Sequence, residues 1–316
     1  MVSVVTGAAD ITFKSASGAY LKALVPGQDL LVANGRFEST TWTATALGPP
    51  LGGAAFGLFG PVTTVLANAV SFLLSAFGVW AAGNRAIGAS EPRPARAGAA
   101  RLRARDLPDG WRYILAHPAL RPLFFNTIAV NALIMATAPL LAVLMLGCLH
   151  FAPWQYGLAF AGPCVGGLIG SRLARRLVAR FGRYKVMLTA GTLRACFSVG
   201  LAFIGPGAAG LVLVMAIELG LITSAGVFNP VYATYRLDQT PADRVARTLS
   251  AWSVTSNATI AALTALWGLL ASLTSLRAAL AIAGLLLLAT PLLLPRREHP
   301  ALRERELPVV AGQTVP

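Results

Sequence analysis

Two ionisable side chains, Glu218 and Arg194, lie deep inside long apolar segments, where charged groups are costly and usually serve a function. At the rise of an α-helix, Arg194 lies roughly 13 Å beyond the basic stretch ending at Lys185, and Glu218 roughly 15 Å beyond the turn at 205–207. Both therefore fall near the midplane of a hydrocarbon core about 30 Å thick. A carboxyl at this depth is protonated when water is excluded and ionised when a cation is near. We predict that Glu218 couples proton movement, with Arg194 as its charge partner; a static buried ion pair is the alternative.

Four further side chains in apolar segments are candidates for lining a binding cavity: Asn126, Asn131, Trp252 and Asn257. A few polar groups in an apolar cavity suit amphipathic small molecules. Hydrogen bonding between helices is the alternative role for each of them.

Residues that bind metals or perform covalent catalysis are not grouped in this sequence. The cysteines and histidines are scattered, and neither an HExxH nor a GxSxG motif occurs. Glu218 is the only acidic residue well inside the last six apolar segments, so paired carboxylates are also missing there. We predict no metal site, no cofactor and no enzyme activity.

The composition is that of an integral membrane protein. Of 316 residues, 56% are hydrophobic and 12% are charged, whereas soluble domains carry about 25% charged residues. The net charge of +14 comes from Lys and Arg in connections, as expected for cytoplasmic loops of membrane proteins. Because no basic patch is interleaved with aromatic residues, we predict no nucleic-acid partner.

Apolar segments recur along the chain, at about 1–25, 40–60, 61–82, 120–148, 154–178, 184–205, 208–235, 246–271 and 275–295. Every second connection is basic, which places those connections in the cytoplasm. Lys22, Arg36 and Glu38 lie near the first of them. We predict an all-α integral membrane bundle of about nine transmembrane helices. Its parts are a truncated N-terminal bundle (1–82), a basic cytoplasmic linker (83–119), a six-helix C-terminal bundle (120–295) and a cytoplasmic tail (296–316).

Three stretches of the sequence resemble exporters of the major facilitator superfamily, in the subgroup of macrolide and siderophore exporters. Residues 46–53 resemble the antiporter motif in the fifth helix of these exporters, with Gly48, Pro49, Gly52 and Gly53 at its key positions. Residues 23–34 resemble the connection between the fourth and fifth helices.

The third stretch, residues 170–185, resembles the basic gating loop between the eighth and ninth helices of the family. Its matching positions are Gly170, Arg180, Gly182, Arg183 and Lys185. Arginines in such a loop can bond helix carboxyl ends and acidic partners, which would hold one face of the transporter shut.

The resemblance implies a bundle of the major facilitator type in which residues 1–25 correspond to the fourth helix, so that the first three helices have no counterpart. In the family the fourth helix faces the cavity, which makes Asp10 a second candidate proton site. A partly solvated segment, with Asp10 paired to Lys14, is the alternative. The resemblance also implies that the helix carrying the glycine ladder at 162, 166 and 170 meets the helix that carries the antiporter motif.

We therefore predict a proton-coupled exporter of drugs, macrolides, siderophores or similar amphipathic molecules that works by alternating access. Its expected partners are a small-molecule substrate, protons and the lipid bilayer, and its expected location is the bacterial inner membrane, as a monomer. Two alternatives stay open. One is a transporter fragment, truncated or with a misassigned start, that does not transport by itself; the other is a membrane scaffold subunit.

Overall fold

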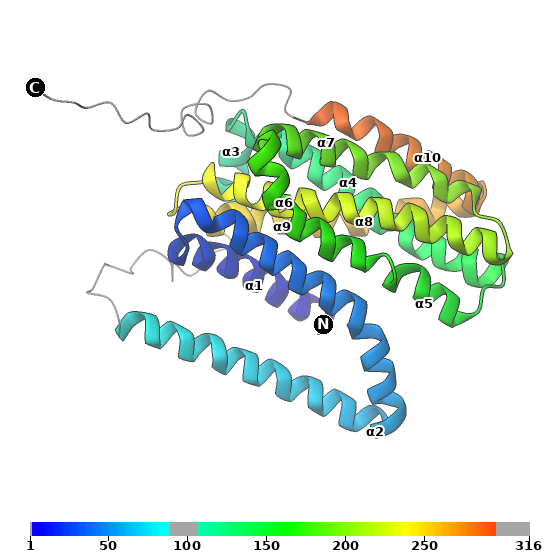
Figure 1. The fold of residues 1–316 in the computed structure, drawn as a ribbon, viewed down its shortest axis with the longest axis horizontal. Coiled ribbons are helices and arrows are strands. Elements are labelled where there is room, and N and C mark those ends of the chain that lie inside the picture. Colours follow the sequence, from blue (N-terminus) through cyan, green and yellow to red (C-terminus); the bar gives the residue numbers. More distant parts are fainter. Residues whose placement is uncertain (1, 89–106, 295–316) are drawn as a thin grey trace, which may run out of the picture.

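The computed structural model describes residues 2–88 and 107–294, and the described chain is helical without any strand (Figure 1). This confirms the predicted all-α architecture. Residues 89–106 of the predicted linker and the whole of the predicted tail lie outside the described residues. The longer helices are α1 (Val2–Leu24), α2 (Leu30–Gly88), α3 (Leu107–Ala116), α4 (Leu120–Ala142), α5 (Pro153–Ala161), α6 (Cys164–Phe181), α7 (Arg183–Cys196), α8 (Gly207–Asp238), α9 (Val245–Leu273) and α10 (Leu276–Ala289).

Helices α4 to α10 form six candidate membrane spans, in agreement with the predicted six-helix C-terminal bundle. Three spans contain a change of helix type: α4 continues as a π-helix (Val143–Cys148), and α7 and α10 continue as 3-10 helices (Phe197–Phe203 and Thr290–Leu293). The second span is divided into α5 and α6 around Pro163, which has no backbone N–H to continue the helix. We call this set of helices the six-helix body.

Helices α1 and α2 lie beside the six-helix body, and α2 turns back on itself at Gly60 (Figure 1). Gly60 has φ 76° and ψ 170°, a conformation that glycine adopts without steric cost, so the predicted turn at 60–61 is present. The backbone stays helical across Gly48–Gly53 despite Pro49 and Pro50. The second half of α2 contains a shorter apolar helix at Val62–Gly78. The described chain thus has three helical segments before residue 89: α1 and the two halves of α2.

Glycines allow α6 and α8 to pack with their backbones almost in contact. A Cβ added at Gly170 would lie 2.4 Å from the Thr223 carbonyl oxygen, and one at Gly226 would lie 2.5 Å from that of Gly167. In a membrane, where lipid is as apolar as the helix surface, such close approach is a main source of helix association. The ladder at 162, 166 and 170 therefore faces α8. The expected contact between the ladder helix α6 and the antiporter-motif helix α2 is present, since Trp42 of α2 lies against Gly167 and Ser39 bonds Ser171. The three ladder glycines themselves face α8, where their neighbours are Met215, Leu219 and Thr223.

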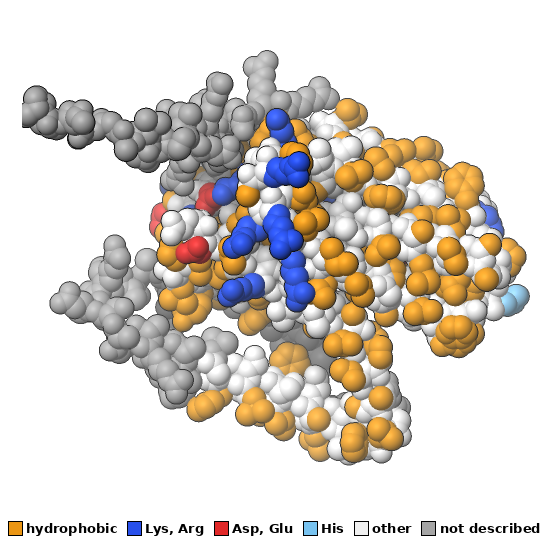
Figure 2. All heavy atoms as spheres, in the orientation of Figure 1, with side chains coloured by type: hydrophobic (Ala, Val, Ile, Leu, Met, Phe, Trp, Pro, Cys, Tyr) orange, Lys and Arg blue, Asp and Glu red, His pale blue; other side chains and the backbone are white. Residues whose placement is uncertain are grey.

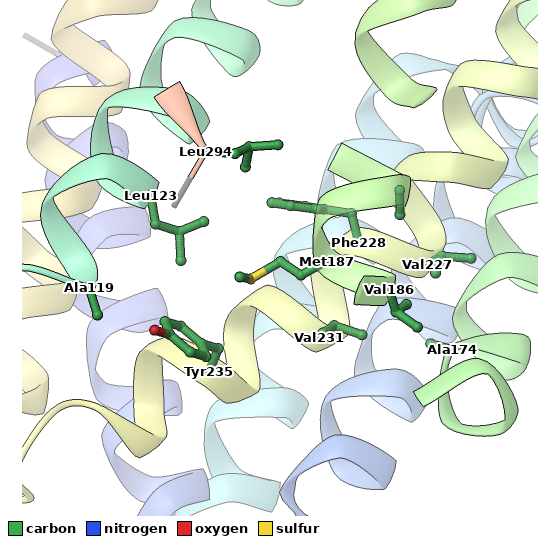
Figure 3. Packing of buried hydrophobic residues seen from close by; sticks show 11 residues of the cluster. Ala119, Leu123, Ala174, Val186, Met187, Val227, Phe228, Val231, Tyr235 and Leu294 are labelled. Carbon is green, nitrogen blue, oxygen red and sulfur yellow. The ribbon is translucent and has the colours of Figure 1, made fainter. Parts of the chain in front are cut away.

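The interior of the six-helix body is filled by apolar side chains from several helices. Figure 3 shows one cluster, in which Phe228 and Val231 of α8 pack near Met187 of α7, with Leu123 of α4 and Leu294 completing it. Phe228 and Val231 are fully buried. This packing fixes the relative positions of α4, α7 and α8, which carry most of the polar residues considered below.

Candidate functional site

Polar contacts join α1 and α2 to the six-helix body at the end of the molecule where the basic connections lie. We call this set the cytoplasmic seam; its side chains are Ser15, Lys22, Asn34, Glu38 and Ser39 on α1 and α2, and Ser171, Asn229, Thr234 and Ser250 on α6, α8 and α9. Arg236, Arg244 and Arg247 lie near it, and the positive-inside rule predicts that such a basic end faces the cytoplasm, which gives the seam its name.

Helix α1 contributes two contacts to the cytoplasmic seam. Lys22 donates through Nζ to the backbone oxygens of Leu237 and Thr240 at the carboxyl end of α8, where a cation complements the helix dipole. Ser250 of α9 donates to Ser15 of α1 over 2.9 Å, and both residues are buried. These contacts hold the end of α1 against α8 and α9.

Helix α2 contributes a carboxylate that bonds across the cytoplasmic seam. Oε1 of Glu38 accepts from Asn229 Nδ2 of α8 at 2.6 Å and from Trp42 Nε1 of its own helix at 2.9 Å. Glu38, predicted to lie near the first connection, is in fact two turns inside α2, which begins at Leu30. The signal available in the sequence was the i, i+4 spacing of Glu38 and Trp42, which places both side chains on one helix face.

The same part of α2 makes three further contacts. Asn34 donates to Thr234 over 3.0 Å, and the hydroxyls of Ser39 and Ser171 are 2.7 Å apart. The Trp42 ring lies over Gly167, where a Cβ would come within 2.5 Å of it. The first three turns of α2 are therefore fitted closely to α6 and α8.

Toward the opposite end, α2 loses contact with the rest of the described chain. Leu47 and Leu51 are 52% and 63% exposed, and Cβ atoms added at Gly48 and Gly52 would meet nothing within 4 Å among described atoms. The antiporter-like stretch thus lies on an uncovered part of α2. In the described chain, the two groups of helices touch at the cytoplasmic end and separate toward the other.

Glu218 lies on α8 and is 8% exposed. It faces α5 and α6, where Tyr156 and Cys164 lie within its electrostatic reach. Among the residues that the structure describes, Glu218 forms neither an ion pair nor a hydrogen bond. A carboxylate in such a place has no group that offsets the cost of burying its charge.

Arg194 is bound elsewhere in the six-helix body and does not reach Glu218. Its Nη2 donates to Asn126 Oδ1 over 2.7 Å, while Asn126 Nδ2 donates to the Thr290 carbonyl over 2.7 Å. The guanidinium carbon also lies 3.6 Å from the centroid of the Phe228 ring. The structure therefore joins α4, α7, α8 and the last span through Arg194, and the static pair with Glu218 is not formed in the described chain.

The four candidate cavity residues are not brought together. Asn126 is fully buried between Arg194 and Thr290, and Trp252 is buried with its ring edge-on to Phe124, 4.8 Å between centroids. Asn131 bonds Ser256 across α4 and α9 over 2.9 Å. Asn131 and Asn257 are both exposed on the face formed by α4 and α9. Only these two remain available to a ligand in this conformation.

Within the described part of the chain, one ion pair joins the predicted gating loop to α8. Gly182 has φ 82°, which ends α6 and lets α7 begin at the next residue. Arg183 then pairs with Asp238 at the end of α8, with 2.5 Å between Nη1 and Oδ2. Arg180 lies over the Phe181 ring, and Lys185 is exposed. The acidic partner, Asp238, was not identified from the sequence.

A neighbouring contact strengthens the same end of the molecule. Tyr113 of the short helix α3 donates its hydroxyl to the Gln239 carbonyl over 2.6 Å, just beyond α8. Partial burial raises the pKa of the Tyr113 hydroxyl above its ordinary value, so this donor keeps its proton at neutral pH. Asp10, the second candidate proton site, lies on α1, but its side chain is outside the described residues.

The described fold is an all-α membrane bundle of the major facilitator type. The family model described as "Transmembrane secretion effector" (MFS_3) matches residues 14–311, and the chain belongs to this family. Comparison with curated proteins gives no match.

Two solved structures share the fold. One is a bacterial homologue of the iron transporter ferroportin in an outward-facing state: TM-score 0.65, 21% identity, 86% of this chain and 65% of that chain covered. The other is the same kind of protein with soaked iron: TM-score 0.63, 19% identity, 86% and 64% covered. The chain thus spans a little under two thirds of the length of these proteins. Among the described residues, no group of three or more His, Cys, Asp or Glu side chains is placed to hold a metal ion.

Proposed function

We propose that this protein takes part in the export of small amphipathic molecules across the bacterial inner membrane by alternating access. The observation that carries the proposal is the cytoplasmic seam, because it closes one end of the bundle with hydrogen bonds that can be broken and remade. Alternating access requires such a contact at one end while the other end is open. The outward direction is supported by the family description and by the antiporter-like residues Gly48, Pro49, Gly52 and Gly53.

Proton coupling through Glu218, with Asp10 as a second site, is part of this proposal. Glu218 is an isolated buried carboxyl, and protonation removes the cost of its charge in the membrane. In this scheme Glu218 takes up a proton as substrate leaves, and releases it when its surroundings admit water. Arg194 contributes by fixing the packing of its helix, Arg183 by holding the gating loop to α8, and the exposed Asn131 and Asn257 by contacting substrate. The protein acts as a monomer.

The test is proton-driven efflux of amphipathic fluorescent dyes from proteoliposomes. Wild-type protein is expected to move at least one dye of a chemically varied panel when a pH gradient is imposed. Glu218→Gln is expected to lose the gradient-driven movement while it keeps dye exchange without a gradient, and Glu218→Asp, which retains a carboxyl, serves as the matched control. Undiminished gradient-driven efflux by Glu218→Gln would remove Glu218 from the mechanism. No movement of any dye by the wild type would favour the fragment or scaffold alternatives.

A further inference from the structure

An open hollow of about 330 Å³ lies between α2 and α6, on the outer face of the bundle beside the cytoplasmic seam. Its walls include Thr40, Thr43, Ala44 and Leu47 of α2, and Leu168 and Arg172 of α6. The volume lies within the range of small-molecule sites, about 300–1,000 Å³. Thr40, Thr43, Ala44 and Leu47 are exposed, so the hollow is open at the surface of the described chain.

The hydroxyls in the hollow do not need a polar ligand. Thr40 donates to the Arg36 carbonyl and Thr43 donates to the Ser39 carbonyl of the same helix. Such local bonding satisfies the hydroxyl donors and leaves methyl groups on the surface. With Ala44, Leu47 and Leu168, the part of the hollow that extends away from the cytoplasm is therefore apolar.

Two arginines lie at the cytoplasmic end of the hollow. Arg172 is part of its wall, and Arg36 lies one turn before Thr40 on the same face of α2. The contact of Gly35 with the Ser171 carbonyl, 3.2 Å from an added Cβ, sets Arg36 and Arg172 at the same level. At the rise per residue of an α-helix, the stretch from Pro153 to Ser171 is roughly 28 Å long. The level of Ser171 is therefore the edge of a hydrocarbon core about 30 Å thick.

Neither arginine is neutralised within the described part of the chain, where neither Arg36 nor Arg172 forms an ion pair or donates a side-chain hydrogen bond. Figure 2 shows Lys and Arg side chains gathered over the left half of this face, with apolar side chains covering the surface to their right. Cations at the membrane edge above an apolar groove match a molecule with an anionic head and a hydrocarbon chain.

We infer that the hollow binds an anionic phospholipid of the inner leaflet. Its phosphate lies between Arg36 and Arg172, and one acyl chain lies along Ala44, Leu47 and Leu168. The lipid touches α2 on one side and α6 on the other, so it bridges the two groups of helices that the cytoplasmic seam joins. Anionic lipid then stabilises the conformation in which the cytoplasmic end is closed. This inference concerns lipid binding and does not depend on transport.

Native mass spectrometry of the purified full chain tests the site, with phosphatidylglycerol and phosphatidylcholine of identical chains as probes. Wild type is expected to retain phosphatidylglycerol in preference to phosphatidylcholine. One basic side chain near a membrane surface contributes about 1 kcal/mol to anionic lipid binding, which corresponds to about a fivefold loss of phosphatidylglycerol affinity for Arg36→Gln or Arg172→Gln. Arg121→Gln, an exposed arginine at the start of α4, is the matched control and should bind as wild type.

Two further measurements separate a lipid site from a general attraction of anions. Ala44→Phe fills the groove without removing a charge, and should release both lipids while thermal unfolding in detergent stays unchanged. Glycerol 3-phosphate, which has the head but no chain, should not compete. Equal retention of the two lipids by wild type, unchanged phosphatidylglycerol binding in Arg172→Gln, or full competition by glycerol 3-phosphate would each overturn the inference.

Discussion

Glu38 illustrates how a single acceptor can set the position of a membrane helix. Its Oε1 accepts two bonds, one from α8 and one from its own helix, so the carboxylate orients the Trp42 ring as well as the Asn229 amide. Trp42 in turn fits against Gly167 of α6. One side chain thus connects α2 to α6 and α8, at a depth where a polar group without a partner is costly.

Removing the hydrogen-bond acceptor at position 38 should lower the stability of the protein, whereas a substitution that keeps an acceptor should not. In Glu38→Leu the donors of Asn229 and Trp42 lose their partner, at a cost of about 1–3 kcal/mol for each buried unsatisfied group. Thermal unfolding in detergent is expected to shift down by several degrees. Glu38→Gln keeps a carbonyl acceptor and should stay close to wild type.

Thr41→Ala is the matched control for the Glu38 variants, because Thr41 is exposed on α2 and bonds only the Phe37 carbonyl of its own helix. It should not change the unfolding temperature. Equal unfolding temperatures for Glu38→Leu and Thr41→Ala would contradict a stabilising role for the Glu38 acceptor.

At the scale of the elements, small residues have opposite consequences on different helices. On α6, Gly170 lies against the backbone of α8, whereas Gly48 and Gly52 on α2 have no described neighbour. The glycines of α6 are explained by packing in this conformation. Those of α2 are not, so a second conformation in which that part of α2 meets another surface would explain them.

This contrast predicts different outcomes for the same substitution. Gly170→Ala forces a Cβ to within 2.4 Å of the Thr223 carbonyl, which should cost about 1–3 kcal/mol and lower the unfolding temperature. Gly52→Ala should leave the stability unchanged or raise it, since alanine is favoured over glycine in a helix by up to about 1 kcal/mol. If the antiporter-like stretch acts in transport, Gly52→Ala should nevertheless reduce dye efflux. A large loss of stability in Gly52→Ala would show that this face is already packed.

At the scale of the whole molecule, the two groups of helices are joined at one end and apart at the other. The contacts that join them are hydrogen bonds together with one apolar cluster, in which Leu30 of α2 packs with Leu237 of α8 and Leu249 of α9. Each such bond contributes only about 0.5–1.5 kcal/mol net. The apolar clusters that lie wholly within the six-helix body are not part of the seam, so the seam can open without disrupting them.

Locking the seam should therefore stop transport reversibly. Ser39 and Ser171 have hydroxyl oxygens 2.7 Å apart, so cysteines at both positions are close enough for a disulfide. In a background with Cys148, Cys164 and Cys196 replaced by serine, oxidation of Ser39→Cys/Ser171→Cys is expected to abolish dye efflux, and reduction to restore it. Each single cysteine variant is the control. Continued efflux by the fully oxidised protein would show that this contact does not open during transport.

The sequence by itself determined the membrane character, the six-helix body and the turn at Gly60, because hydropathy, alternating loop charge and a Gly-Pro pair are local properties. It also placed Arg194 and Glu218 within long apolar helices, as the structure does, since helical rise converts sequence distance into position along a helix. Which way each side chain points was decided only by the tertiary structure. Arg194 bonds Asn126 instead of Glu218, because rotation about the helix axis depends on which neighbour packs beside it.

The cytoplasmic seam could not be read from the sequence for the same physical reason. Glu38 and Asn229 are far apart in the chain, and neither has a distinguishing local pattern until α2 and α8 are placed side by side. The glycine ladder predicted a close contact between helices, but only the packing showed that α8 is the helix its glycines meet. Pairings between distant helices depend on shape and partner polarity together, and these become defined only when the bundle is assembled.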